Sequence, residues 1–425
     1  MSLLLLLFLH LFYITLFGYT VAKHPFFTKS GITTKYLLLG YSIKLLGGFA
    51  YGYIYSHWYS GGDTWEYFGC SKLMHNAFYI KPQYYFQLVF GACNYTPTDP
   101  QFFEIIKSIA HWSDERTYFI LRLNAIVQWF SFGNYYVHTI FWVFFSMIGL
   151  VAFYRTLSFY FSNYTYLIYG LLFFQPALFF WGSGVHKDGL TLMALGLYVY
   201  ACHKLLVDYK KWQWYIIILL CLSMFYYLRP HLVVLLLPAT IAWCISEWYK
   251  LKPKWVFATT YLVLAILLVV ASYWSLNLNV FRKLMQIQYV FIVYLHGDGD
   301  ISIPFLQPTW QSALLNCPMA LYNTIVTPFT NGIFRSIQHQ LAAFESLLLL
   351  LLILWAIAKY IYRPIKLIAF WYFCIALSLT FLLLIGLTTD NIGAIVRYRT
   401  IVLPLLTPAL ALLTGLTDQQ IKIKK

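Results

Sequence analysis

Charged residues are scarce in this sequence, since Asp, Glu, Lys and Arg make up only 10% of its 425 residues. A soluble domain carries about 25% charged residues, so the composition excludes a wholly water-soluble protein. Hydrophobic residues make up 61% of the chain, and its mean hydropathy is +0.68. The sequence therefore predicts an integral membrane protein, with the lipid bilayer as a partner.

Acidic residues are the scarcer of the two signs, with 14 Asp and Glu against 29 Lys and Arg, a formal net charge of +15. In a soluble protein this excess would point to nucleic acid. Here the basic residues fall in short clusters between long apolar runs, where they report the side of the membrane on which a loop lies. We therefore predict no nucleic-acid partner.

Long apolar runs, each able to cross about 30 Å of hydrocarbon, number eleven and predict an all-α transmembrane bundle of about eleven spans. Another run, 118–132, contains Arg122, Asn124 and Gln128 and predicts an interfacial or re-entrant helix. The eleven expected spans are 3–22, 36–56, 135–154, 165–182, 190–206, 213–228, 231–248, 255–274, 343–361, 367–387 and 400–416.

The basic residues favour one orientation. With the N-terminus outside, sixteen of the 29 basic residues and three acidic ones fall on the cytoplasmic side, whereas the outside holds twelve basic and eleven acidic residues. The remaining basic residue, Lys44, lies inside the second span and is expected to snorkel toward the cytoplasm. The asymmetry predicts an extracytoplasmic N-terminus and a cytoplasmic C-terminus.

No linker, charge block or internal repeat divides the chain, which favours a single membrane domain over 1–425. Its two long outside loops, about 57–134 and 275–342, are rich in aromatic residues and are expected to form interfacial helices. The first apolar run ends in the small residues Thr20-Val21-Ala22, which is typical of a cleaved signal peptide, but it lacks a basic start. We prefer an uncleaved helix.

The seven cysteines form no CxxC pair and show no metal-ligand spacing with histidine. Cys202, Cys221, Cys244 and Cys374 fall in expected spans and are interpreted as small core residues. Cys70 and Cys93 share the first outside loop, where an oxidising compartment permits a disulfide. Both the free and the bonded form remain open.

The first candidate site follows the second span, in Gly61-Gly62-Asp63-Thr64-Trp65-Glu66-Tyr67. Two glycines permit a tight turn. The turn delivers Asp63 and Glu66 to the edge of the bilayer, where a carboxylate acts as a general base or as a ligand of Mg or Mn. An ordinary Gly-Gly-Asp turn with a solvated Glu66 explains the pattern equally well.

The second candidate site is the polar segment between two apolar runs that contains His186, Lys187 and Asp188. Asp188 can cap the following helix, and the positive end of that helix beside Lys187 suits an anion such as a lipid phosphate. Alternatively, Lys187 and Asp188 neutralise each other in an exposed turn. The flanking glycines favour a functional role.

Two further candidates are basic. Arg229-Pro230-His231 joins two closely spaced runs, where an arginine at a helix end can also simply snorkel. Arg397 and Arg399 precede the last span and predict a guanidinium clamp for a pyrophosphate. Arg335 is a further candidate for substrate binding in the second long loop.

Asp298-Gly299-Asp300, also in the second long loop, has the spacing of a divalent-metal site, although a flexible polar turn is the better interpretation. No Gly-rich nucleotide-binding fingerprint is present. A metal cofactor, Mg or Mn, therefore stays open, and no other cofactor is predicted.

These motifs resemble those of the GT-C class of polytopic glycosyltransferases and of related bacterial membrane proteins of surface-polysaccharide assembly. The residues that carry the resemblance are Gly62-Asp63 with Tyr67, Trp181 to Asp188, Arg229-Pro230, and Arg397-Tyr398-Arg399 followed by Pro404. The chain departs from the class in one respect, because its acidic loop follows the second span and not the first.

The resemblance implies an enzyme of the bacterial inner membrane that transfers a sugar from a polyprenyl-phosphate donor to a glycan or lipid acceptor at the outer face. Asp63 would be the base or a metal ligand. The leaving phosphate would be neutralised by Lys187, Arg229, Arg397 and Arg399.

Two other functions remain open. An O-antigen-type polysaccharide polymerase uses closely related chemistry on a diphosphate-linked glycan. A transporter or lipid flippase would instead place charges near the bilayer midplane. Only Lys44 lies well inside an expected span, which favours the glycosyltransferase.

Overall fold

The computed structural model describes residues 2–207, 211–295, 297, 299–332 and 337–415. Over these residues the protein is all-helical, with 81% helix and no strand. A single isolated bridge pairs Asp300 with Asn391 within the same described part. The predicted all-α class is therefore confirmed.

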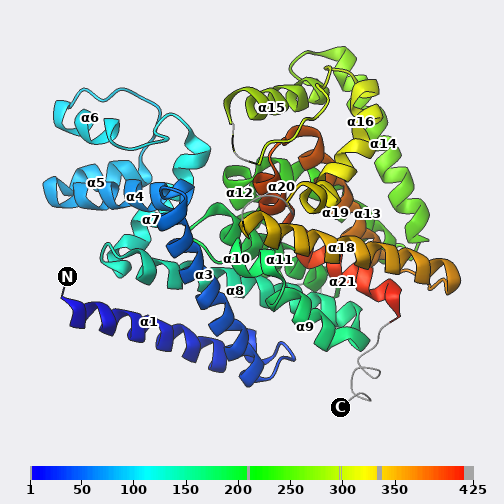
Figure 1. Ribbon diagram of the computed structural model, residues 1–425, viewed down its shortest axis with the longest axis horizontal. Coiled ribbons are helices and arrows are strands. Elements are labelled where there is room, and N and C mark those ends of the chain that lie inside the picture. Colours follow the sequence, from blue (N-terminus) through cyan, green and yellow to red (C-terminus); the bar gives the residue numbers. More distant parts are fainter. Residues whose placement is uncertain (1, 208–210, 296, 298, 333–336, 416–425) are drawn as a thin grey trace. The chain divides into compact units, whose positions relative to one another are not determined.

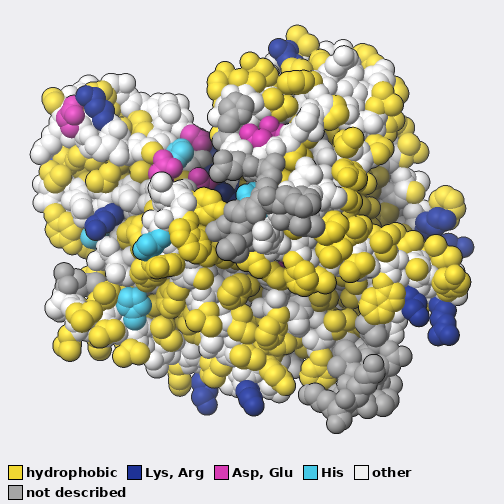
Figure 2. Space-filling model, in the orientation of Figure 1, with side chains coloured by type: hydrophobic (Ala, Val, Ile, Leu, Met, Phe, Trp, Pro, Cys, Tyr) yellow, Lys and Arg dark blue, Asp and Glu magenta, His cyan; other side chains and the backbone are white. Residues whose placement is uncertain are grey.

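Eight of the described helices are long and apolar enough to cross a membrane. Hydrophobic side chains also cover most of the face seen in Figure 2. Both observations support an integral membrane protein, because a water-facing surface of this composition would be unstable. The eight helices are α1 (Leu3–Lys23), α3 (Thr34–Trp58), α8 (Tyr135–Tyr160), α11 (Lys187–Val207), α13 (Pro230–Trp248), α14 (Pro253–Trp274), α18 (Ile337–Tyr362) and α19 (Ala369–Thr388).

Three expected spans take other forms. The run 165–182 is broken into α9 (Thr165–Phe173) and α10 (Pro176–Phe180), since the residue before a proline disfavours helix. Helix α12 (Gln213–Leu228) has 16 residues, fewer than the about 20 that cross a bilayer. The run 400–416 belongs to a pair bent by 73°, α20 (Ile392–Arg399) and α21 (Leu403–Thr414). The structure supports eight spans, or nine with this pair, so the count of eleven stays a prediction.

The two long predicted loops are helical, as expected, and none of their helices is among the candidate spans. Their position at the membrane surface stays a prediction. The first loop contains α4 (Gly62–Ile80), α5 (Pro82–Phe90), α6 (Pro100–Lys107) and α7 (Glu115–Ser131), and the second contains α15 (Val280–Tyr294), α16 (Trp310–Ile325) and α17 (Thr327–Gly332). Two short elements, α2 (Pro25–Thr28) and the 3₁₀ helix η1 (Ser162–Tyr164), complete the chain.

The chain divides into two compact units. The first comprises residues 1–156, 172–205 and 210–231, and the second comprises 157–171, 206–209 and 232–425. The expectation of one domain over 1–425 stays a prediction.

In the first unit, α4, α5 and α7 lie side by side, and α7 also packs against α12 (Figure 1). A fully buried polar network joins α4, α7 and α8: the Gln128 amide donates to Ser71 Oγ at 2.9 Å, and His138 Nε2 lies 2.8 Å from Asn124 Oδ1. Buried polar groups need such partners. The network explains how 118–132 accommodates Asn124 and Gln128 without facing lipid.

In the second unit, α16 packs along α19, and α18 packs against α17 and α21. Gln288 of α15 ties the extended segment after α15 to the end of α19. Its amide nitrogen donates to the carbonyls of Pro304 at 3.0 Å and Leu387 at 2.9 Å, and its oxygen accepts from the Leu306 N–H at 2.7 Å.

Candidate functional site

The turn before α4 places the first carboxylate. Gly61 and Gly62 both have positive φ, 96° and 52°, a conformation that side-chain-bearing residues rarely adopt. Asp63 follows in the first turn of α4, where the positive end of the helix favours a negative charge. Its side chain is 49% exposed, so Asp63 is both held by the fold and accessible to a ligand.

A buried turn before α11 places the second group. The Val185 carbonyl accepts from the Thr64 hydroxyl at 3.0 Å, and the His186 carbonyl accepts from the Trp142 indole N–H at 3.1 Å. Helices α4 and α8 thus fix the backbone on both sides of the imidazole. The His186 side chain is only 1% exposed.

Four ionisable side chains form a connected chain inside the first unit. His186 Nε2 lies 3.3 Å from Asp63 Oδ2, and His186 Nδ1 lies 3.0 Å from Asp188 Oδ2. The other oxygen of Asp188, Oδ1, accepts a 2.7 Å hydrogen bond from Arg229. The order is carboxylate, imidazole, carboxylate, guanidinium, and it runs from the accessible Asp63 into a desolvated interior.

His186 Nδ1 has two neighbours. The Asp188 carboxylate lies 3.0 Å from Nδ1, whereas the Asp188 N–H approaches it at 3.4 Å. In the tautomer with the proton on Nδ1, the ring donates to Asp188, as in hydrolytic triads where a carboxylate orients a histidine. Nε2 is then an acceptor that faces Asp63, so the two side chains can share one proton.

Lys187 adds a cation beside this pair. Its Nζ donates to Thr117 Oγ1 at 2.8 Å and lies 5.8 Å from the centre of the Tyr67 ring. Burial raises the pKa of Asp114, but hydrogen bonds from Thr117 and the Arg116 N–H, with the Lys187 charge, hold this pKa below its ordinary value. Lys187 therefore places positive charge where α4, α7 and α11 meet.

Glu66, the other predicted catalytic carboxylate, lies one turn after Asp63 and is 46% exposed. Its Oε1 is 3.5 Å from His111 Nε2. The Tyr67 ring lies between the two histidines, 6.0 Å from His111 and 5.7 Å from His186 between ring centres. Glu66 thus borders the buried chain, and its catalytic role stays a prediction.

The remaining predicted residues divide between the units. His231 lies in the first turn of α13, two residues after Arg229. Arg335 lies outside the described residues. Arg397 and Arg399 belong to α20 of the second unit.

The two arginines of the predicted clamp have different surroundings. Arg397 is half-buried. Arg399 is fully buried and donates to Ser346 Oγ at 2.7 Å and to the Thr324 carbonyl at 3.1 Å, with Glu345 Oε2 at 3.6 Å. Arg399 therefore has partners within the protein, and a shared pyrophosphate clamp stays a prediction.

The sequence interpretation missed one feature and misplaced another. The roles of Thr64 and Trp142 in holding the turn before α11 carry no sequence signal, because a buried Thr or Trp is common in any helix bundle. The snorkelling predicted for Lys44 is wrong, since its side chain is fully buried and its Nζ donates to the carbonyls of Leu178 and Gly182.

No group of three His, Cys, Asp or Glu side chains in the described part of the chain is arranged to hold a metal ion. Mg²⁺ is usually held by one or two carboxylates together with phosphate oxygens and water. A role for Asp63 or Glu66 as a metal ligand stays a prediction. Asp298 lies outside the described residues, and the Asp300 carboxylate accepts from Asn391 and from the Gly297 N–H.

Cys70 and Cys93 are both free thiols, so the disulfide that the sequence left open is not formed. Burial raises the pKa of both thiols. The Glu66 charge also raises the pKa of the Cys70 thiol, whereas the Arg122 charge offsets part of the rise for the Cys93 thiol. Both are therefore protonated and weakly reactive at neutral pH.

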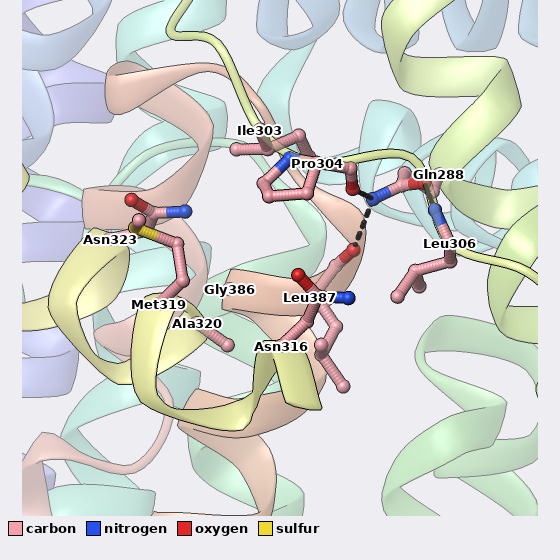
Figure 3. Close-up of a pocket in the computed structure, with 10 residues that line it drawn as sticks. All are labelled: Gln288, Ile303, Pro304, Leu306, Asn316, Met319, Ala320, Asn323, Gly386 and Leu387. Carbon is pink, nitrogen blue, oxygen red and sulfur yellow. Dashed lines mark hydrogen bonds between the residues drawn. The ribbon is translucent and has the colours of Figure 1, made fainter. Parts of the chain in front are cut away.

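A small pocket lies within the second unit, between the extended segment after α15 and helices α16 and α19 (Figure 3). The pocket has room for about one water molecule, far less than the roughly 300 Å³ typical of ligand pockets. The Gln288 amide in its wall is already bonded to Pro304 and Leu387. The candidate site therefore remains the four linked side chains of the first unit, Asp63, His186, Asp188 and Arg229.

No family model, curated protein or solved structure matches this chain.

Proposed function

We propose that the protein is a membrane glycosyltransferase that moves a sugar from a polyprenyl-phosphate donor to a glycan or lipid acceptor. The observation that supports this best is the half-exposed Asp63 carboxylate, 3.3 Å from a buried imidazole that Asp188 orients. General bases need such access together with a tuned, fixed partner.

In this proposal the acceptor hydroxyl gives its proton to Asp63, with His186 as the coupled partner. The hydroxyl oxygen forms a bond to the anomeric carbon as the bond from that carbon to the phosphate oxygen breaks. The electron pair leaves with the polyprenyl phosphate, and a single displacement inverts the anomeric centre.

The leaving phosphate gains negative charge in this step, and we assign Lys187, whose Nζ lies 5.8 Å from the centre of the Tyr67 ring beside the site, to neutralise that charge. Donors aimed at developing charge usually provide the largest share of catalysis. Arg229, which the resemblance also assigned to the phosphate, instead binds Asp188 at 2.7 Å. We therefore assign it the positioning of Asp188 and leave phosphate binding in the first unit to Lys187.

The proposal places the reaction at the extracytoplasmic face of the bacterial inner membrane, with the N-terminus outside and α4 to α7 at the membrane surface. It places the protein in cell-envelope glycan assembly. The test is mass spectrometry of lipid-linked saccharides from cells without the gene. Accumulation of one polyprenyl-phosphate sugar, reversed by the wild-type gene, supports a transferase, whereas an unchanged lipid profile contradicts it. Accumulation of a complete diphosphate-linked repeat unit indicates the polymerase instead.

A transporter is the second candidate, and one observation favours it. Glu345 lies inside the candidate span α18, is buried, and faces Arg399 at 3.6 Å. Ionisable groups inside membrane segments often mark transport pathways. Proteoliposomes separate the functions, because a transporter moves its solute or lipid across the bilayer without any change in covalent structure.

A further inference from the structure

Among the described residues of the first unit, Lys44 is the most deeply buried cationic side chain. It lies in the middle of α3, a candidate membrane span, and its side chain is 0% exposed. No carboxylate of the described residues lies within 4.0 Å of its Nζ. A lysine in such a place needs strong partners, because an uncompensated charge in a membrane is costly.

Its partners are two backbone carbonyls. Nζ donates to the Leu178 carbonyl at 2.9 Å and to the Gly182 carbonyl at 2.8 Å. Leu178 belongs to the five-residue helix α10, and Gly182 opens the turn that leads to His186. Carbonyls at a helix C-terminus lack partners within the helix, and a cation satisfies them well.

The packing of α3 shows that this contact is built into the fold. A Cβ atom at Gly47 would come within 2.3 Å of the Phe179 carbonyl oxygen, and one at Gly48 within 2.8 Å of the Ser183 carbonyl oxygen. Only glycine permits α3 to approach the turn this closely. The approach brings the Lys44 stem within reach of both carbonyls.

The same turn carries the candidate base. Lys44 donates a hydrogen bond to the Gly182 carbonyl at the start of the turn. Thr64 and Trp142 donate to the carbonyls of Val185 and His186 at its end. Without the ammonium, two carbonyls in a dry interior would lose their partners, and the turn would relax. His186 would then shift from Asp63 and Asp188.

We propose that Lys44 is a positioning residue: its ammonium, bound to Leu178 and Gly182, fixes the turn that holds His186 between Asp63 and Asp188. This inference rests on the proposed function for its catalytic meaning. The geometry that it claims can be measured without a substrate.

The experiment compares purified wild-type protein with Lys44→Met, which removes the donors at similar length, and Lys44→Arg, which keeps a cation. Leu37→Ala, a fully buried position of the same helix, controls for general destabilisation. Hydrogen exchange over 181–188 and the ¹⁵N imidazole signals of His186 are recorded for each protein.

In Lys44→Met, exchange over 181–188 is expected to accelerate by about tenfold or more, since two buried hydrogen bonds are lost. The His186 signals are expected to change as well. Leu37→Ala should lower thermal stability yet leave both readouts as in the wild type, and Lys44→Arg should restore part of the protection. In a transfer assay, kcat of Lys44→Met should fall by about 10²-fold with KM unchanged, as for a small misplacement of a reacting group.

Wild-type exchange and imidazole signals in Lys44→Met would overturn the inference, whether or not the protein transfers a sugar. Equal changes in Leu37→Ala would also overturn it, because they would reflect stability alone. Full transfer by Asp63→Asn overturns the proposed function instead and leaves the exchange result for Lys44 standing.

Discussion

The Nδ1 atom of His186 lies 3.0 Å from Oδ2 of Asp188, and each of the two side chains is only 1% exposed. Asp188 is also bound by Arg229, so its buried charge is shared between a ring and a guanidinium. A buried charge is stable only with such partners. This contact links the stability of the first unit to the chemistry proposed for Asp63.

Asp188→Asn is expected to lower the free energy of unfolding by about 3–5 kcal/mol, because it leaves Arg229 without its carboxylate. The double variant Asp188→Asn with Arg229→Gln should lose less than the sum of the single losses, with a coupling of about 1–3 kcal/mol. Denaturant unfolding in detergent is measured for the wild type, Asp188→Asn, Arg229→Gln and the double variant. Glu104→Gln, which breaks the exposed pair with Lys107, is the control and should cost little. Purely additive losses would show that the buried pair is not coupled.

Lys187→Met is expected to reduce kcat/KM of sugar transfer by about 10²–10³-fold, as for the loss of one group that stabilises developing charge. Thr117→Val is the matched control, because it removes the 2.8 Å contact to Nζ and keeps the ammonium. It should reduce the rate much less. Steady-state kinetics with the lipid-linked donor compares the variants, and equal effects would mean that Lys187 acts only through Thr117.

Arg399→Met is expected to destabilise the protein by about 3–5 kcal/mol, because it leaves the buried Glu345 without its cation. Arg397→Met should lower stability much less and should weaken donor binding if Arg397 holds phosphate. Thermal unfolding and donor-binding isotherms on both variants separate these roles. The opposite pattern, with Arg397 decisive for stability and Arg399 for binding, would reverse the assignment.

Membrane orientation has a direct test in which the native cysteines are first replaced. A new cysteine at Asn94 is expected to react with an impermeant maleimide on intact spheroplasts, because the proposal places the first long loop outside. A new cysteine at Lys252 should react only after lysis, since the basic cluster there is expected in the cytoplasm. Labelling of both from the same side would exclude this orientation.

Much of the site was predictable because charges stand out in an apolar chain. Asp63, His186, Asp188 and Arg229 were each identified from short motifs, and the structure joins them into one chain. The order in which these side chains contact one another was not predictable, since it depends on how α4, α11 and α12 pack. The all-α class followed in the same way from the apolar runs alone.

Burial and span count were harder to predict. Arg399 has the same sequence surroundings as Arg397, yet it pairs with Glu345 of a distant helix. Lys44 was expected at the membrane edge, but glycines of α3 bring it to the carbonyls of a neighbouring turn. Apolar runs of similar hydropathy became one straight helix or two bent ones according to a single Pro or a short break.

The most direct test of the central claim is transfer of a labelled sugar from the lipid-linked donor by purified wild-type protein and by Asp63→Asn. The variant keeps the size of the side chain but removes its basicity. We predict that Asp63→Asn binds donor normally and transfers sugar at least about 10²-fold more slowly than the wild type. The control variant Asp99→Asn changes a carboxylate at the start of α6 and should transfer sugar at the wild-type rate. Transfer by Asp63→Asn at the wild-type rate would contradict the account.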